Sequence, residues 1–430
     1  MSGSSSIDSS IPPSLYRGGS PRWIDGLLSF ADIGLLLMLC SFYLVPAVAG
    51  VQTGFYLTLV LPTLLLLGWR RDFGFLRSWQ FAVFCGLPLL LAISSLWAPA
   101  DGGDVRREFS FYLKLVAYLA VLYCALYLVL ERRGPAPLAR WLLWLIPVGT
   151  ASCIASLAHY GLDGGFAHWR RIGGISLEGD IDKTAMLYGF HALFCCYGIS
   201  RRSRRWQLLS WSGLVISCAY ILLSQTKIPI VMSAAAIALA ALVSGSRVLR
   251  IAVALAFVAA PLGYMAIFGD LPLMHRSVAY SIRLELWGKA FDEFLQSPLI
   301  GSGLMYKWFL ELRTTLPHPH NYLLDIARFS GLLGVLFAAA QLLAAASAAR
   351  DPAGWRQWVP GLYIAWFGFG TVAMLVYAQQ PLVRPSYIWF YYWVPLAVLL
   401  VLDQLSGAQR RHATVAAATA GNSTIAESHG

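Results

Sequence analysis

The feature that most constrains this chain is the recurrence, along almost its whole length, of apolar runs close to the length that spans a bilayer as a helix, about 20 residues. Short connections rich in Arg, Gly and Pro separate these runs. The composition agrees, because 58% of the residues are hydrophobic and 12% are charged, against about 45–50% and 25% in soluble domains. The sequence therefore predicts a helical protein embedded in a membrane and argues against a soluble fold.

We predict an all-α integral membrane protein of about twelve transmembrane helices with one large periplasmic loop that contains helices. An even number of spans places both chain ends on the same side. The expected divisions are a disordered cytoplasmic tail over 1–25, helices 1–9 over 26–268, the periplasmic loop over 269–328, helices 10–12 over 329–405, and a second disordered cytoplasmic tail over 406–430. The expected spans are 27–46, 51–68, 80–97, 110–130, 141–160, 184–199, 207–223, 228–243, 248–268, 329–349, 357–378 and 386–404.

Arginine is concentrated in alternate connections, and this pattern sets the expected orientation. The densest cluster, Arg201, Arg202, Arg204 and Arg205, follows the sixth expected span. Short cytoplasmic loops are enriched in Arg and Lys, so we assign this connection and both chain ends to the cytoplasmic side of a bacterial inner membrane. The formal net charge of +11 then mainly reflects topology, and no nucleic-acid partner is expected.

Several kinds of chemistry lack support in the sequence. The seven cysteines lie inside apolar runs without a CxxC pair, so neither disulfides nor a metal site is predicted. No P-loop, GxSxG or HExxH pattern occurs. Asp180 and Asp182 have the DxD spacing of some nucleotide-sugar enzymes. The topology puts them outside the cytoplasm, however, and a solvated pair beside Lys183 is the simpler interpretation.

The long loop is expected to be folded. Apolar residues recur there at helical spacing until a Ser-Pro pair, which predicts a helix over 278–296. Arg283 and Trp287 are one turn apart on this helix. Gly301 and Gly303 follow and predict a turn beside the helix end.

Two of the eight histidines, His318 and His320, stand next to prolines just before the tenth expected span. Pro317 and Pro319 restrict the backbone to extended conformations, which holds both imidazoles at the membrane surface. An imidazole, with a reference pKa of about 6.5, can accept a proton from a sugar hydroxyl near neutral pH. The alternative is that these are interfacial histidines with satisfied hydrogen bonds, or one weak metal half-site.

Cations also occupy external loops that should contain few of them. Lys227 lies in a short turn between the seventh and eighth expected spans, and two arginine pairs, Arg106–Arg107 and Arg170–Arg171, lie in other external loops. The planar guanidinium is well suited to phosphate. Contact with lipid headgroups explains these positions nearly as well.

Ionisable residues in or beside the expected spans are a further signal. Asp32, Lys114, Asp325 and Arg328 are of this kind, and a charge there is costly unless it is paired or faces water. Asp325 and Arg328 are three residues apart and can pair with each other.

Taken in order, these features resemble the O-antigen ligase and polymerase superfamily of membrane glycosyltransferases. Its members typically combine about twelve spans and a large late periplasmic loop with three short motifs. The motifs are an Arg-x-x-x-Trp helix, a Gly-x-Gly turn and a His-Asn-x-x-Leu sequence that enters the next helix. In this chain they are Arg283 to Trp287, Gly301 to Gly303, and His320-Asn321 to Leu324, with Gly331 and Gly334 further on. The topological resemblance covers roughly 25–405, and the motif set covers 283–334.

The resemblance implies an O-antigen ligase of lipopolysaccharide biosynthesis. Its donor would be a glycan on undecaprenyl pyrophosphate, and its acceptor a sugar hydroxyl of lipid A-core. His320 would act as general base or at least orient the acceptor hydroxyl, while Arg283 and Lys227 would bind and neutralise the pyrophosphate. The reaction would be inverting and metal-independent, without a cofactor. Family members commonly have arginine at the position of Lys227, and lysine keeps the charge but loses the bidentate geometry.

The same resemblance implies further substrate contacts. A supporting role falls to His318 and Arg313, and the motif residues Trp287 and Asn321 are expected to bind substrate. The paired arginines are candidates for reading phosphates on lipid A or on the donor: Arg106, Arg107, Arg170 and Arg171. We expect a monomer among membrane lipids.

Two alternatives remain open. An O-antigen polymerase shares the motifs and the donor but passes the chain to another lipid-linked repeat unit, and ligation to a protein such as pilin is a further variant. A transporter or lipid-linked-glycan flippase is the alternative from a different class. It would usually show two related halves and substrate groups near the bilayer midplane, whereas here the informative residues gather on one face.

Overall fold

A computed structural model describes residues 21–98, 104–168, 170–201, 203–243, 247–255, 277–304, 310–311, 315–316, 318–348 and 358–427. The described part is helical apart from turns and one two-residue antiparallel ladder, β1 (Leu310–Glu311) with β2 (Thr315–Leu316). The main helices are α1 (Arg22–Leu44), α2 (Val48–Phe55), α3 (Leu61–Arg70), α4 (Trp79–Ser94), α5 (Val105–Arg133), α6 (Ala136–Leu162), α8 (Ile181–Ile199), α9 (Arg204–Leu223), α10 (Lys227–Val243), α12 (Ser277–Gln296), α13 (Tyr322–Ala348), α15 (Trp358–Tyr377) and α16 (Val394–Glu427).

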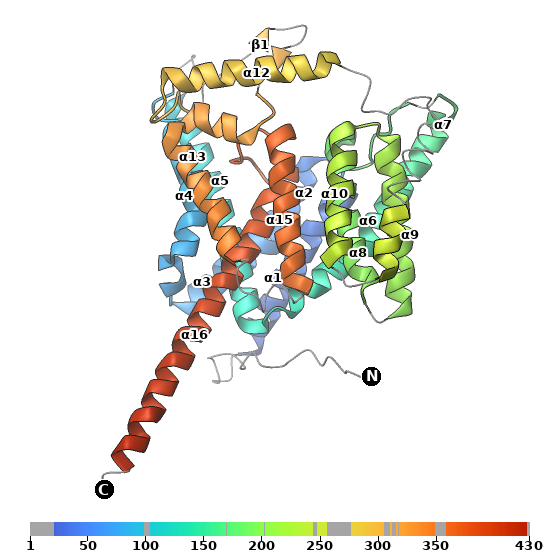
Figure 1. Cartoon of the computed structure of the whole chain (residues 1–430). Coiled ribbons are helices and arrows are strands. Elements are labelled where there is room, and N and C mark those ends of the chain that lie inside the picture. Colours follow the sequence, from blue (N-terminus) through green and yellow to red (C-terminus); the bar gives the residue numbers. More distant parts are fainter. Residues whose placement is uncertain are drawn as a thin grey trace.

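The helices form an upright bundle, and α12 lies across one end of it, which we call the α12 end (Figure 1). Seven helices in the described residues are long and apolar enough to cross a bilayer, and three shorter apolar helices accompany them. The prediction of an all-helical membrane fold is therefore confirmed. The number of twelve spans stays a prediction, since the ninth expected span, 248–268, lies partly outside the described residues.

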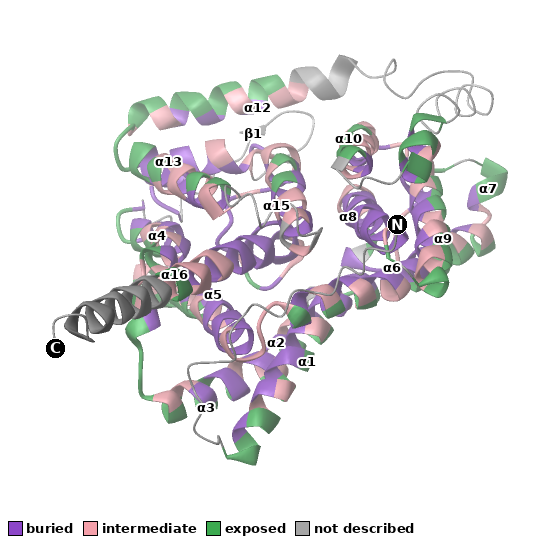
Figure 2. Ribbon diagram, turned by 60° about the horizontal axis from the view of Figure 1, so that its bottom comes forward, coloured by how far each residue is buried: buried purple, intermediate pink, exposed green. Residues whose placement is uncertain are grey.

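Two elements form the centre of the bundle. Every residue of α8 from Thr184 to Ile199 is buried, and so is the chain from Ile388 to Val401, which includes the π-helical segment η4 (Trp389–Trp393). The Phe390 ring lies 5.5 Å from the ring of Phe190 on α8 and 4.8 Å from that of Trp366 on α15. Figure 2 shows both central elements in the colour of buried residues, with exposed residues around them.

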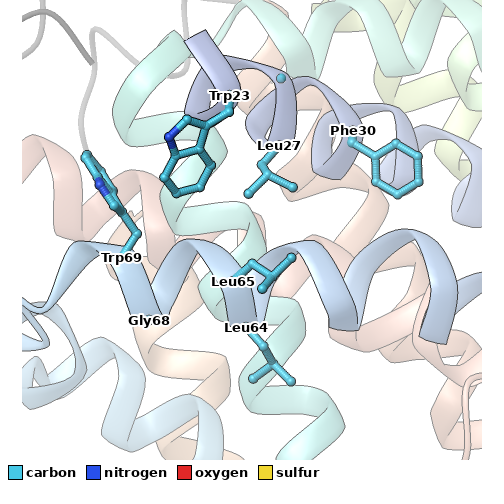
Figure 3. A pocket seen from close by; sticks show the side chains of 8 residues that line it. Trp23, Leu27, Phe30, Leu64, Leu65, Gly68 and Trp69 are labelled. Carbon is cyan, nitrogen blue, oxygen red and sulfur yellow. The ribbon is translucent and has the colours of Figure 1, made fainter. Parts of the chain in front are cut away.

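The outside of the bundle is apolar as well. Between α1 and α3 it forms an open cavity of about 810 Å³, and the exposed side chains of Phe30, Leu64 and Leu65 line it (Figure 3). The rings of Trp23 and Trp69 meet at 6.3 Å beside it. An apolar surface edged by tryptophans is typical of a protein that faces lipid chains.

Two expected boundaries differ from the structure. The tenth expected span begins at 329, but α13 begins at Tyr322 and contains a non-helical Gly331 with a φ of 62°. It consists of a short first helix and a longer one joined at this kink. The disordered tail expected over 406–430 is wrong as far as Glu427, because α16 continues to that residue. The segment is rich in alanine and has no proline, which favours a helix.

A buried carboxylate on α1 ties three helices together at the end opposite α12. Asp32 is fully buried and accepts hydrogen bonds from Arg133 at 2.6 Å and from the Trp141 indole at 2.8 Å. Arg140 also contacts it. The pairing confirms that this intramembrane charge is neutralised by partners, as burial of a carboxylate requires.

We expect Asp32→Ala to destabilise the protein by roughly 2–3 kcal/mol, because both arginines lose their buried counter-ion but keep some water. Thermal unfolding of the purified protein in detergent measures this. Asp25→Ala is the matched control, since Asp25 is 56% exposed and lies 3.8 Å from Arg132. Equal losses in the two variants would contradict a structural role for Asp32.

Candidate functional site

The helix across the end of the bundle positions the histidine segment. The predicted helix over 278–296 is confirmed as α12 (Ser277–Gln296). Its inner side buries Leu286 and Ala290 completely. From the same helix the Trp287 indole N–H donates to the carbonyl of Pro319 at 3.0 Å. The Arg-x-x-x-Trp motif therefore contacts the backbone directly between the two histidines.

His318 and His320 face each other. Their ring centroids are 4.2 Å apart, and the backbone N–H of His320 donates to Nδ1 of His318 at 3.3 Å. His320 has a φ of 52°, in the left-handed region that residues other than glycine rarely adopt. Its imidazole also hydrogen-bonds to the backbone of Tyr377, the last residue of α15. The surroundings thus hold His320 in an unfavourable conformation, a feature that recurs at active sites.

Burial lowers the pKa of both histidines. The pKa of His320 falls to about 4, and the positive charges of His318 and Arg283 add to the effect of burial. The pKa of His318 also falls to about 4, with contributions from Arg328 and Lys183. Both imidazoles are therefore neutral at pH 7, so a ring nitrogen of each is free of a proton. This is the state that a general base requires.

Asn321 caps the following helix. Its side-chain oxygen accepts from the backbone N–H groups of Leu323 at 3.0 Å and Leu324 at 3.2 Å. This is standard N-cap geometry, and it fixes the direction in which α13 leaves the histidines. The contacts of Asn321 are structural, and its predicted role in substrate binding stays a prediction.

An ion network lies beneath the histidines. Arg328 is 2% exposed and donates to Asp325 at 2.7 Å and to Glu293 of α12 at 3.5 Å. The second oxygen of Asp325 accepts the backbone N–H of Gln380 at 2.6 Å. The predicted pairing of Asp325 with Arg328 is confirmed, and it forms part of a larger network that joins α12, α13 and the chain after α15.

The glycine turn packs against the kink of α13. Gly301 and Gly303 have φ values of 72° and 88°, and the N–H of Gly303 donates to the carbonyl of Phe329 at 3.0 Å. A Cβ on Gly301 would lie 2.3 Å from the carbonyl carbon of Phe329, and a Cβ on Gly331 would lie 2.3 Å from that of Leu299. Only glycine allows this close approach of two backbones.

Arg283 reaches toward the same place from α12. Its guanidinium carbon lies 5.3 Å from the ring centre of Tyr377, and its side chain hydrogen-bonds to that tyrosine. His320 and Arg283 therefore share Tyr377 as a neighbour, and the charge of Arg283 acts on the imidazole of His320. The sequence did not single out Tyr377, because a tyrosine at the end of an apolar span is ordinary.

Arg171 connects this group to the turn that carries Lys227. Its guanidinium donates to Asp182 at 2.9 Å, to the carbonyl of Ser224 at 3.0 Å and to the hydroxyl of Thr226 at 3.1 Å. Lys227 follows directly as the first residue of α10 and is half-buried. Asp182 and Arg171 both act electrostatically on Tyr377. The structure thus gathers His320, Arg283 and the α9–α10 turn at the α12 end.

The other predicted residues lie apart from this group or outside the description. Arg106 and Arg107 are exposed in the first turn of α5, where Asp104 accepts from both backbone N–H groups. Arg170 is exposed and donates to the carbonyl of Asp163 at 2.6 Å. Arg313 lies outside the described residues.

The DxD pair has a structural explanation. The Asp180 side chain accepts from the Lys183 backbone N–H and so caps α8. It also pairs with the Lys183 ammonium at 2.8 Å. Asp182 pairs with Arg171, and among the described residues no cluster of His, Cys, Asp and Glu is suited to hold a metal ion.

Fold and site together define a polytopic helical membrane protein with histidines and cations gathered at one end of the bundle. The chain is similar to the O-antigen ligase family. Residues 212–339 match the family model described as O-antigen ligase, and this range includes Lys227, Arg283, Trp287 and His320. The resemblance seen in the sequence motifs is thereby confirmed.

The similarity to a curated relative extends over nearly the whole chain. The O-antigen ligase of Pseudomonas aeruginosa is 28% identical over 398 residues, which cover 90% of this chain and 94% of the relative. No solved structure matches the chain.

The lowered pKa values predict a pH dependence of stability. In the unfolded chain the histidines have pKa values of about 6.5, so between pH 6.5 and 4 the unfolded state binds protons that the folded state does not. Stability should be insensitive to these groups above pH 6.5 and should fall as the pH drops toward 4. The thermal midpoint of the double variant His318→Gln/His320→Gln should fall less between pH 7 and 5 than that of wild type. Parallel curves for the two proteins would be the contrary result.

Proposed function

We propose that this protein is an O-antigen ligase that transfers a glycan from undecaprenyl pyrophosphate to a sugar hydroxyl of lipid A-core. The observation that carries the proposal is the meeting of His320 and Arg283 at Tyr377, next to the turn of Lys227, inside the part of the chain that matches the family. A proton acceptor and cations side by side suit a reaction in which a hydroxyl attacks and a pyrophosphate departs.

In this mechanism His320 acts as general base. Its hydrogen bond to the Tyr377 backbone orients the ring, and a neutral imidazole that donates through one nitrogen keeps the other as an acceptor. The acceptor hydroxyl loses its proton to that nitrogen as its oxygen bonds to the anomeric carbon. The bond between that carbon and the phosphate oxygen breaks, and attack from the opposite side inverts the configuration.

Arg283 and Lys227 bind the departing undecaprenyl pyrophosphate. Negative charge grows on it as the glycosidic bond breaks, and fixed cations in a half-buried site stabilise that charge. No metal or cofactor has a role in this proposal. Three contacts of Arg171 are already made within the protein, so we assign it to positioning the Lys227 turn. His318 supports His320 through its ring and its Nδ1 atom.

The proposed orientation places the α12 end in the periplasm and both chain ends in the cytoplasm of the inner membrane. The connection between α8 and α9 lies at the end of the bundle opposite α12 (Figure 1). It holds Arg201, and Arg204 and Arg205 follow it as the first residues of α9. Positively charged short loops are retained on the cytoplasmic side. The lipid-linked donor and the lipid A-core acceptor would then meet at the membrane surface beside α12, with the enzyme acting as a monomer.

A reconstituted assay with purified protein, undecaprenyl-pyrophosphate-linked O-glycan and lipid A-core tests the proposal. A glycan-bearing lipid A-core product establishes a ligase. Longer lipid-linked chains with unchanged lipid A-core would instead identify a polymerase. The absence of both products would favour the alternative of a transporter.

His320→Ala is expected to reduce transfer by about 10²–10⁴-fold, the usual contribution of a general base, while donor binding is retained. The measurement is the initial rate of glycan transfer together with donor affinity. His159→Ala is the matched control, because His159 is an exposed histidine with a 62% accessible side chain. Transfer at the wild-type rate by His320→Ala would remove it from the base role.

Lys227→Arg is expected to keep or raise transfer activity, because arginine restores the bidentate phosphate contact. Lys227→Gln should weaken donor binding and slow transfer by roughly tenfold or more, since about 1.4 kcal/mol of lost charge interaction is one decade. Rates and donor affinities of both variants provide the measurement. An inactive but folded Lys227→Arg protein would argue against phosphate charge as the function of this position.

A further inference from the structure

A second cluster of polar groups lies at the α12 end, and the mechanism above does not use it. It lines a cavity of about 500 Å³ whose polar side chains are Gln52, Lys183, Gln379, Arg384, Ser386 and Tyr387. These come from α2, α8 and the segment between α15 and η4. Two of the lining residues are cations, and none of the lining residues in the described part of the chain is an acid.

The two cations are held at their places by neighbouring groups. The Lys183 ammonium pairs with Asp180 at 2.8 Å and lies 5.1 Å from the ring centre of Tyr387. The guanidinium carbon of Arg384 lies 5.1 Å from the ring centre of Phe111 on α5, and the residue is exposed. The charge of Lys183 is therefore partly compensated by Asp180. The guanidinium of Arg384 is supported by the aromatic face of Phe111, and a planar guanidinium is well suited to bind phosphate.

The cavity also contains an unsatisfied polar atom. The Ser386 hydroxyl oxygen is buried without a hydrogen-bond partner among the described residues, and a buried polar atom of this kind calls for an explanation. Ser386 lines the cavity, so a rotation of its side chain would let the hydroxyl donate a hydrogen bond to a ligand there.

Two π-helical turns lie directly beside the cavity. The segment η1 (Tyr56–Val60) begins one turn after Gln52, and η4 begins two residues after Tyr387. The ring of Phe55, the last residue of α2 before η1, lies 5.2 Å from that of Trp389, the first residue of η4. Such turns are rare and occur frequently at functional sites.

The cavity is fixed relative to the histidines. Tyr377 contacts His320, and Tyr387, ten residues later, lines the cavity. Hydrogen bonds from two buried indoles hold the segment between them. The indole N–H of Trp389 donates to the Val383 carbonyl at 2.9 Å, and that of Trp393 to the Pro381 carbonyl at 2.8 Å. The charge of Lys183 also acts on His318. A ligand in the cavity would lie beside Lys183, whose charge reaches His318, the neighbour of the proposed base.

We propose that this cavity binds a phosphate group of the glycosyl acceptor, apart from the cations that hold the donor pyrophosphate. The inference rests on the proposed function. Transfer requires that donor and acceptor be bound together beside the same general base. The two donor phosphates are assigned to Arg283 and Lys227, so the acceptor needs a site of its own. A phosphorylated saccharide of lipid A-core presents the anion that Lys183 and Arg384 complement, and it presents hydroxyls near His318 and His320.

Equilibrium binding of lipid A-core to the full-length protein in phosphatidylcholine nanodiscs, without donor, tests this. The double variant Lys183→Gln/Arg384→Gln should bind native lipid A-core at least about tenfold more weakly than wild type, one decade per 1.4 kcal/mol. Its affinity for undecaprenyl pyrophosphate should stay unchanged. Lys289→Gln on α12 is the matched control, an exposed lysine outside the cavity, and should bind as wild type does.

Phosphatase-treated lipid A-core provides the decisive comparison. Wild type should bind it as weakly as the double variant binds native lipid A-core, and the variant should not distinguish the two, because the effects share one interaction. The proposal would be overturned if the double substitution lowered the affinity for native and for phosphatase-treated lipid A-core by the same factor. It would also be overturned if the substitution lowered only the affinity for the donor. Phosphatidylglycerol nanodiscs that abolish the phosphate dependence would show a lipid-headgroup site instead, which also overturns it.

The outcomes remain separable from those of the proposed function. Binding is measured without turnover, so a wild type that binds lipid A-core through these cations but transfers no glycan would refute the ligase and retain the cavity assignment. If the double variant unfolds, Arg384→Gln alone decides, because Arg384 is exposed. Rescue of affinity by Arg384→Lys would confirm that charge is what the position supplies.

Discussion

The structure around the candidate site depends on one buried charge, the guanidinium of Arg328. It is withdrawn from water and lies 4.2 Å from the ring centre of Phe329, and such a charge is stable only if partners replace the lost hydration. Those partners come from different parts of the chain: Asp325 from the same helix, Glu293 from α12, and, through Asp325, the backbone of Gln380. The condition that this charge be paired therefore fixes α12 and the segment after Tyr377 relative to His320.

The same surroundings connect donor binding with base strength. The charge of Arg283 helps to hold the pKa of His320 down in the free protein, which makes the imidazole neutral but weakly basic. A bound pyrophosphate compensates that charge. Under the proposed function, occupation of the donor site therefore strengthens the base at the moment when the acceptor hydroxyl has to lose its proton.

Much of this was accessible from local sequence patterns. Apolar run length located the helices, helical spacing located α12 to within a residue, and a separation of three residues indicated the Asp325–Arg328 pair. Interactions between distant segments were not accessible. Helix packing decides three of them: the position of Tyr377 beside His320, the hydrogen bonds of Arg171 to Asp182 and Thr226, and the cavity around Arg384. The expected span starts after the charged residues Asp325 and Arg328, whereas α13 already begins at Tyr322 and kinks at Gly331, because these two charges pair with each other inside the helix.

The Arg328 network also has a consequence for how the protein is made. Membrane proteins are inserted as they are synthesised, and Asp325 has both oxygens engaged only when Gln380 has emerged. Until then the Asp325 carboxylate lacks one of its hydrogen-bond partners, and its exposure to lipid would be costly. Assembly of this end of the bundle is therefore a late event that needs the last part of the chain. A ribosome stalled before residue 380 would leave a protein whose earlier spans are inserted and whose candidate site is unassembled.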